Sequence, residues 1–84
     1  MAAAEAGLLR LVLCRHRGVI HAFEDACPHA HGPLSHGNFV EGRLICPWHA
    51  WEFVCETGGW DANPAVRLRR FPAKVEAGRI WVDA

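Results

Sequence analysis

Short runs of hydrophobic residues alternate with turn residues along the chain, and the turns recur about every 8–12 residues. No sustained stretch keeps the 3.6-residue apolar period of an amphipathic helix. Gly18 stands in the turn of a first predicted hairpin, and Glu41–Gly42 form the turn of a second. The expected strands cover residues 8–15, 19–23, 39–40, 43–45, 52–54, 66–69, 71–76 and 79–82. The pattern therefore predicts an all-β fold.

Two predicted loops, residues 27–37 and 46–50, interrupt the strands, and both contain Pro and His. The first seven residues hold Glu5 among alanines and are expected to be disordered. No leading strand is then left to cover residues 8–14, and such an open sheet edge invites pairing with another chain. The 84 residues suit a single domain, 1–84, which we expect to be a monomer or an edge-strand homodimer.

The charges of the chain balance, with nine Lys and Arg against nine Asp and Glu. Nucleic-acid-binding proteins usually carry a basic stripe, so no nucleic-acid partner is expected. No apolar run approaches the about 20 residues of a membrane span, and no secretory signal or twin-Arg pair precedes the domain. We therefore expect a cytoplasmic protein without a membrane partner, whose four Cys are ligands or thiols rather than disulfides.

Each of the two loops carries one Cys and one His at close spacing. The first reads Cys27-Pro28-His29 and the second Cys46-Pro47-Trp48-His49. The predicted hairpin between them would bring the loops side by side, so that they offer two thiolates and two imidazoles. Cys27 and Cys46 could instead be ordinary buried residues, and the histidines ordinary surface residues. That interpretation would not explain why a Cys and a His occur together in both loops. A structural Cys₂His₂ zinc site remains an alternative, although zinc sites more often use C-x₂₋₄-C knuckles.

The pattern C-x-H followed by C-x-x-H resembles the Rieske motif, with Cys27, His29, Cys46 and His49 as ligands. The segment 46–53 (CPWHAWEF) is similar to the second loop of Rieske ferredoxins and oxygenases, and Pro33-Leu34-Ser35 with Gly37 matches the first. Residues 70–76, with Gly78 and Val82, resemble the closing strands. The resemblance covers about residues 12–83.

This resemblance implies one 2Fe-2S cluster, with the two Cys on one iron and the two His on the other. It also implies an antiparallel β base and a two-loop cluster-binding subdomain at about residues 26–63. Asn63-Pro64-Ala65 lies where the family has a capping Pro loop. The resemblance further implies that Leu34, Pro47 and Trp48 keep water off the cluster, with His29 and His49 at an exposed tip.

The neighbours of the ligands predict a low reduction potential. Respiratory Rieske proteins join their loops by a disulfide, but the matching positions here are Gly32 and Trp48. Those proteins also use a Ser and a Tyr hydroxyl to stabilise the reduced cluster, where this chain has Trp51 and Phe53. Without these donors we expect a potential near the low end of the Rieske range, about −150 mV.

The chain lacks the second iron site of a Rieske oxygenase, because no His follows His49. It therefore resembles a stand-alone ferredoxin, a one-electron carrier rather than an enzyme. Its redox partners would be a flavin-dependent reductase and an oxygenase or similar acceptor. The alternatives are a zinc-binding interaction module, a Rieske-like small subunit of a nitrite reductase, and a redox sensor that loses its cluster on oxidation.

The remaining Cys and His are expected to be structural or solvent-exposed residues and not ligands. Cys14 and Cys55 are expected to be packed thiols, and His21 a strand residue that faces solvent. His16 is expected in a turn, and His31 and His36 in the first loop as solvated residues. Arg67, Arg69 and Arg70 are expected on an exposed strand face. Ala50 stands where the family commonly has Gly, so a positive φ there would strain the second loop.

Overall fold

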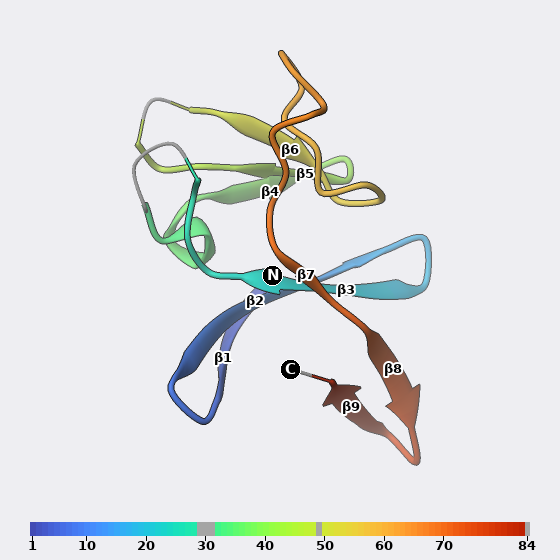
Figure 1. Cartoon of the computed structure of the whole chain (residues 1–84). Coiled ribbons are helices and arrows are strands. Elements are labelled where there is room, and N and C mark those ends of the chain that lie inside the picture. The colour runs from blue at the N-terminus through green and yellow to red at the C-terminus, as the bar shows by residue number, and fades with distance from the viewer. Residues whose placement is uncertain (29–31, 49, 84) are drawn as a thin grey trace.

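The described part of the chain forms three small antiparallel sheets (Figure 1). The computed structural model describes residues 1–28, 32–48 and 50–83. Its elements are β1 (Ala2–Ala6), β2 (Leu9–His16), β3 (Val19–Glu24), a 3₁₀ turn η1 (Leu34–His36), β4 (Asn38–Val40), β5 (Arg43–Ile45), β6 (Glu52–Val54), β7 (Arg70–Phe71), β8 (Ala73–Glu76) and β9 (Arg79–Val82). The predicted all-β class is confirmed.

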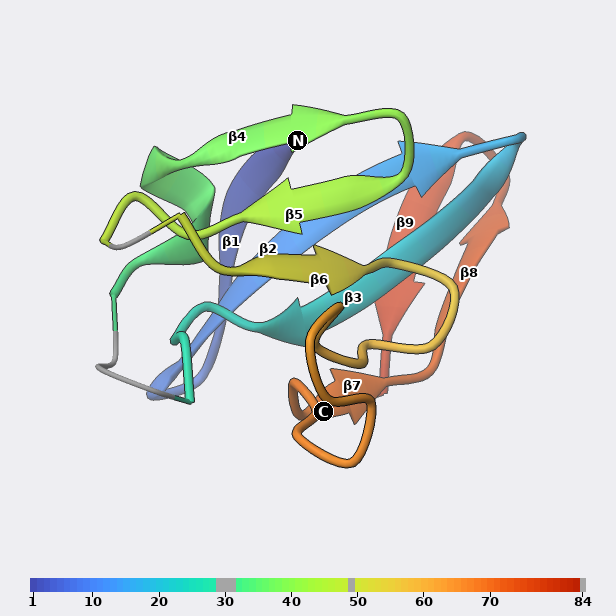
Figure 2. The ribbon, with the colours of Figure 1, turned by 90° about the horizontal axis from the view of Figure 1, so that it is seen from above.

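The sheets are arranged with the base in the middle of the molecule. The base sheet has the order β1-β2-β3-β7, a second sheet has the order β4-β5-β6, and β8 pairs with β9. The view from above shows the β4–β6 sheet lying over the base sheet, with β5 and β6 crossing over β2 (Figure 2). The β8–β9 hairpin extends from the opposite side of the base (Figure 1).

Two-residue turns close three of the hairpins and set their registers. Arg17 and Gly18 have φ of 52° and 77°, Glu41 and Gly42 of 47° and 78°, and Ala77 and Gly78 of 53° and 75°. Positive φ at both central positions matches the twist of antiparallel strands, which is why Gly occupies the second position each time. The predicted hairpins around Gly18 and Glu41–Gly42, and the predicted junction at Ala77–Gly78, are confirmed.

The expectation that residues 1–7 are disordered and that no leading strand exists was wrong. Ala2–Ala6 forms β1 and pairs with β2 from Ala2 opposite Leu13 to Ala6 opposite Leu9. Five residues are too few for a stable helix despite the helix propensity of Ala. The Ala4 and Ala6 side chains pack against Leu11 and its buried neighbours, so tertiary contact decides the strand. The oligomeric state, monomer or homodimer, stays a prediction.

The strand predicted at 66–69 does not form. Its backbone groups bond to partners in different segments: Val66 N donates to Asn63 O and Val66 O accepts from Trp60 N, whereas Leu68 N donates to Gly58 O and Arg69 O accepts from Glu24 N. The segment therefore joins β3 to the turn after β6 instead of extending a sheet. The strand predicted at 71–76 divides at Pro72 into β7 and β8, because Pro has no N–H for a ladder.

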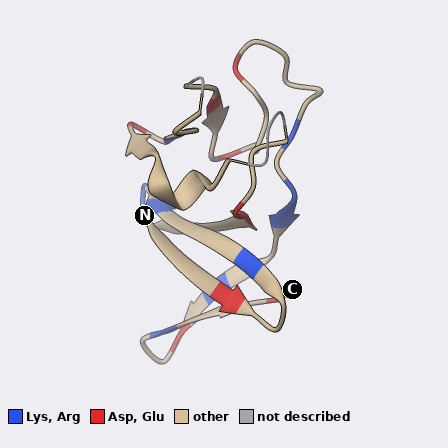
Figure 3. Cartoon of the chain, turned by 90° about the vertical axis from the view of Figure 1, so that its left-hand side faces the viewer, with Lys and Arg blue, Asp and Glu red and all other residues tan. Residues whose placement is uncertain are grey.

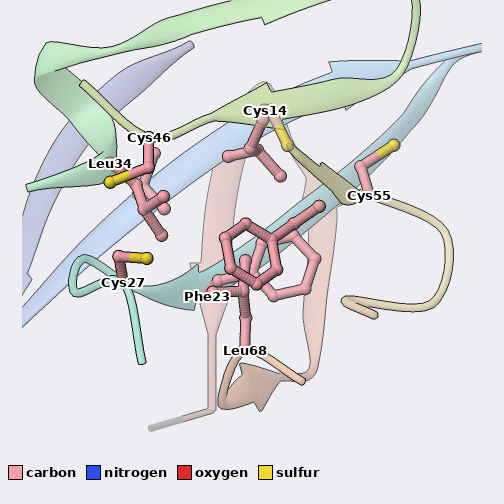
Figure 4. Close-up of a cluster of buried hydrophobic side chains, with 10 residues drawn as sticks. Cys14, Phe23, Cys27, Leu34, Cys46, Cys55 and Leu68 are labelled. Atoms are coloured by element: carbon pink, nitrogen blue, oxygen red, sulfur yellow. The ribbon is translucent and has the colours of Figure 1, made fainter. Parts of the chain in front are cut away.

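The main core lies between the base and the β4–β6 sheet. Its buried members are Val12, Cys14, Phe23, Cys27, Leu34, Leu44, Cys46, Phe53, Cys55 and Leu68 (Figure 4). Successive strand residues point to opposite faces, so Leu11 joins Ala22 and Phe71 in a second cluster. Cys14 and Cys55 are buried as predicted, and burial raises the pKa of Cys14 to about 12.

His21 does not face solvent, and that prediction was wrong. Its side chain is 5% exposed and its ring stacks on Phe23. Arg70 covers it, with Nη2 2.6 Å from His21 Nδ1, while Nη1 donates to the carbonyls of Cys55 and Glu56 at 3.0 Å. Arg70 is therefore a bridge between the base and the chain after β6, not simply part of an exposed strand face.

The charged residues are otherwise spread over the molecule. Acidic and basic positions are interleaved along the base strands and the loops (Figure 3). Arg43 pairs with Asp61 at 2.8 Å, and Lys74 with Glu76 at 3.0 Å. This distribution agrees with the formal net charge of zero.

His21 makes the stability of the fold sensitive to acid. Burial and the charge of Arg70 lower the pKa of His21 from 6.5, so the unfolded chain takes up this proton more readily than the folded one. The stabilisation that neutral His21 provides is present above pH 6.5 and is lost as the pH falls. The free energy of unfolding, measured by denaturant titration, should therefore decrease below pH 6.5 more steeply in the wild type than in His21→Gln. Parallel curves for the two proteins would contradict this.

Candidate metal centre

Two loops that leave different sheets deliver the two predicted cysteine ligands. Cys27 follows β3 and Cys46 directly follows β5. The Cys27 N–H donates to Gly32 O at 2.9 Å, and the Cys46 N–H donates to Trp51 O at 2.8 Å. Each cysteine is therefore fixed by the same kind of bond, to a carbonyl five residues further along its own loop.

The two thiols lie beside each other within the protein. Cys27 is 0% and Cys46 1% exposed, and neither forms a disulfide. They project into one space next to Leu34, which is itself fully buried (Figure 4). A pair of thiols that converge from two loops is the arrangement that a single iron or zinc ion requires of two Cys ligands.

The surroundings of Cys46 influence the charge of its thiol. Burial raises the pKa of Cys46, and a hydrogen bond with the Cys27 thiol raises it further. The Trp48 N–H, 3.4 Å from Cys46 Sγ, acts in the opposite direction because it stabilises a thiolate. A cation bound to both sulfurs would displace their protons and accept the negative charge that burial disfavours.

Two glycines allow the loops to approach each other. A Cβ on Gly32 would lie 2.9 Å from Cys46 Sγ and 3.2 Å from Trp48 Cδ2. A Cβ on Gly37 would lie 1.9 Å from Ile45 O, just before Cys46. In the sequence these positions stand out only in relation to the family, although a glycine inside a ligand loop is itself a signal of close approach.

The second loop carries backbone strain and an aromatic support. Ala50 has a φ of 54°, so the strain expected for a positive φ is present, at a cost of about 1–2 kcal/mol. Trp51 stacks in parallel on Trp60 with ring centroids 3.6 Å apart, which ties the end of the loop to the turn after β6. Phe53 is fully buried next to Trp51, with the two ring centroids 6.4 Å apart.

The predicted histidine ligands, His29 and His49, lie outside the described residues, as does His31. Within the described ranges no three His, Cys, Asp or Glu side chains come together as a metal site. His36 is described; it lies in η1 and is exposed, as expected. The structure therefore describes two of the four predicted ligands, Cys27 and Cys46, and it brings their thiols together.

Comparison with known proteins identifies the family. The model of the Rieske [2Fe-2S] domain matches residues 1–72. The chain belongs to the Rieske [2Fe-2S] domain family. Such a domain binds a 2Fe-2S cluster, which confirms the predicted cofactor, and the paired buried thiols fit the cysteine half of its ligands.

Relatives of this Rieske domain include components of oxygenase systems. The chain is 42% identical over 80 residues to the ferredoxin component of the alkene monooxygenase system of Xanthobacter autotrophicus. That alignment covers 93% of the chain and 65% of the relative. The chain is also 40% identical over 75 residues to 4beta-methylsterol monooxygenase of Methylococcus capsulatus, covering 77% of the chain and 20% of that protein.

Solved Rieske structures have the same fold. The ferredoxin of carbazole 1,9a-dioxygenase from Nocardioides aromaticivorans superposes with a TM-score of 0.85 at 26% identity, over 96% of this chain and 81% of that one. A chain from the complex of reduced oxygenase and oxidized ferredoxin in carbazole 1,9a-dioxygenase gives 0.83 at 30% identity, over 95% and 83% of the two chains.

Gly32 offers a test of the close approach between the Rieske loops. In Gly32→Ala the new methyl group would overlap Cys46 Sγ, and such overpacking costs about 1–3 kcal/mol. The iron content after reconstitution should therefore fall severalfold relative to wild type. Gly78→Ala is the control, because it strains a hairpin turn at φ 75° with no atom within 4 Å of the new Cβ. Equal iron contents in the two variants would contradict the expected role of Gly32.

Proposed function

We propose that this Rieske protein is a ferredoxin that carries one electron at a time from a flavin-dependent reductase to an oxygenase or a similar acceptor. The observation that carries this proposal is the pair of buried thiols held together by two loops. The names of its relatives, ferredoxin components of alkene monooxygenase and carbazole dioxygenase systems, point to the same role. A carrier needs a redox group that a partner can approach, and the residues Pro28, Pro47 and Trp48 beside the two thiol-bearing loops are exposed.

The proposed ligands are Cys27 and Cys46 for one iron and His29 and His49 for the other. The adjacent thiols support the first pair, and the Cys-His spacing of both loops supports the second. A bound cluster supplies reversible one-electron oxidation and reduction. The described residues shield the site, since Leu34 and Phe53 are fully buried in the same core as both thiols.

The partner proteins are expected to approach next to these loops. Pro28, Pro47 and Trp48 flank the ligand positions and are exposed, with Trp48 at 49%. A small apolar surface of this kind suits the weak redox encounters that bury less than about 1,200 Å². We propose a cytoplasmic location because none of the four described cysteines forms a disulfide, as is usual in a reducing compartment. Among the described residues, no helix has the length and hydrophobicity to cross a membrane.

Matched pairs of variants test the proposed ligands. Cys27→Ser, Cys46→Ser, His29→Ala and His49→Ala should each lose the red-brown colour and the anisotropic EPR signal of low average g after dithionite reduction. Cys14→Ala, Cys55→Ala and His36→Ala are the controls and should retain both, because these residues lie outside the proposed ligand set. A colourless wild type with stoichiometric zinc after iron-replete expression would refute the carrier proposal and favour a zinc-binding module.

The reduction potential tests the argument from missing hydroxyl groups. We expect a wild-type potential near about −150 mV by voltammetry, because Trp51 and Phe53 donate no hydroxyl hydrogen bond to the cluster. Trp51→Ser should raise the potential, since one hydrogen bond worth about 1 kcal/mol corresponds to roughly 40 mV. Trp60→Ser is the control because it breaks the same ring stack from the other side. A wild-type potential above about +100 mV would show the argument to be wrong.

A further inference from the structure

The Asp25 side chain connects the end of the base sheet to the far end of the first ligand loop. Asp25 follows β3, and its N–H donates to Arg10 O in β2 at 2.9 Å. Its Oδ1 accepts the Ser35 N–H at 2.7 Å, and its Oδ2 accepts the Ser35 hydroxyl at 2.5 Å. Both oxygens of one carboxylate thus bind a single residue, and we call this pair the Asp25–Ser35 clamp.

Ser35 lies where a small shift would disturb the thiols. It is in η1 directly after Leu34, which is fully buried in the core that contains Cys27 and Cys46. No side chain caps η1 at Pro33, so the Ser35 N–H at its start finds its partner in Asp25. The position of Leu34 against the thiols therefore depends on a carboxylate two residues before Cys27.

We propose that Asp25 is a positioning residue for the metal site, which holds the first loop in its ligand-bearing form before metal binds. This proposal rests on the proposed cluster ligands. Asp25 and Ser35 lie on either side of the hydrogen bond from the Cys27 N–H to Gly32 O. Opening the clamp would therefore release Leu34 and Gly32 from the second loop.

The clamp lies beside a cavity. Asp25 and Ser35 line a cavity of about 170 Å³ together with Arg10, Glu5 and His36. Arg10 and Glu5 are opposite each other across β1 and β2 and carry opposite charges, so the two hydrogen bonds with Ser35 are the contacts that fix the Asp25 side chain. Pre-formed geometry of this kind lowers the entropy that ligands lose when they bind.

The clamp acts on the loop rather than on the whole fold. The β1–β2 and β2–β3 ladders form along their full registers without any contribution from the Asp25 side chain. Loss of the clamp should therefore open the loop locally and leave the base sheet intact. This separates a positioning role from a general structural one.

Hydrogen exchange of the metal-free 84-residue chain tests the clamp directly. In Asp25→Ala, amide exchange at Cys27 and Ser35 should rise about tenfold to a hundredfold, the range expected for lost hydrogen bonds to a charged group. Ser35→Ala removes only the hydroxyl bond and should have a smaller effect, whereas Ser35→Thr keeps the hydroxyl and should behave as wild type. Thr57→Ala is the matched control. It removes the hydrogen bond that the Gly59 N–H donates to Thr57 Oγ1, which is also a bond from a backbone N–H to a side chain but lies in the turn after β6.

Iron release from the reconstituted protein provides the second readout. Transfer of iron to a chelator should speed up at least severalfold in Asp25→Ala and not in Thr57→Ala or Ser35→Thr. The double variant Asp25→Ala with Ser35→Ala should release iron no faster than Asp25→Ala alone, because both changes break one interaction.

The possible results distinguish the two proposals. Additive effects in the double variant, unchanged exchange at Cys27 in Asp25→Ala, or an equal rise in exchange throughout β2 and β3 would overturn the clamp. A wild type that binds the cluster while Asp25→Ala retains iron equally well would overturn the clamp alone. A wild type that takes up no iron would overturn the proposed ligands and, with them, the role of Asp25 as a positioning residue.

Discussion

The rest of the structure depends on one constraint, which is that two thiols from different sheets must lie side by side in a space closed to water. Cys27 arrives from the base and Cys46 from the β4–β6 sheet, and each is 1% exposed or less. A buried pair of this kind is unfavourable as thiolates and becomes favourable when a cation shares their charge. The fold brings the two sulfurs together, and a bound metal would compensate the negative charge of the two buried thiolates.

Backbone hydrogen bonds and glycines keep the Cys27 and Cys46 thiols close to each other. The amides of Cys27 and Cys46 bond within their own loops, and the Trp48 N–H lies against the Cys46 sulfur. Gly32 and Gly37 remove the side chains that would keep the loops apart. A Cβ on Gly32 would lie 3.2 Å from Trp48 Cδ2, so close packing between these two residues helps to hold the loops together.

Interactions between the sheets fix the platform from which the loops extend. Arg70 reaches from β7 to His21 and to the carbonyls of Cys55 and Glu56, and so joins the base to the upper sheet away from the thiols. Asp25 plays a similar part at the thiol end through Ser35. In both places a charged side chain forms hydrogen bonds with polar groups that lie outside the strand ladders, the carbonyls of Cys55 and Glu56 in one case and the N–H and hydroxyl of Ser35 in the other. Polar groups inside a protein usually need such partners.

The sequence by itself determined the all-β class, the hairpin turns and the two Cys-His pairs, because turn chemistry and ligand spacing are written in residues close together along the chain. Tertiary structure decided the rest. β1 exists because β2 offers its edge, residues 66–69 are not a strand because their partners lie partly in β3 and partly in the turn after β6, and His21 is buried because Arg70 covers it. The closeness of Gly32 to Cys46 and the hydrogen bond from Ser35 to Asp25 also join distant positions. Local patterns carry no information about such contacts, since these arise only when the sheets pack together.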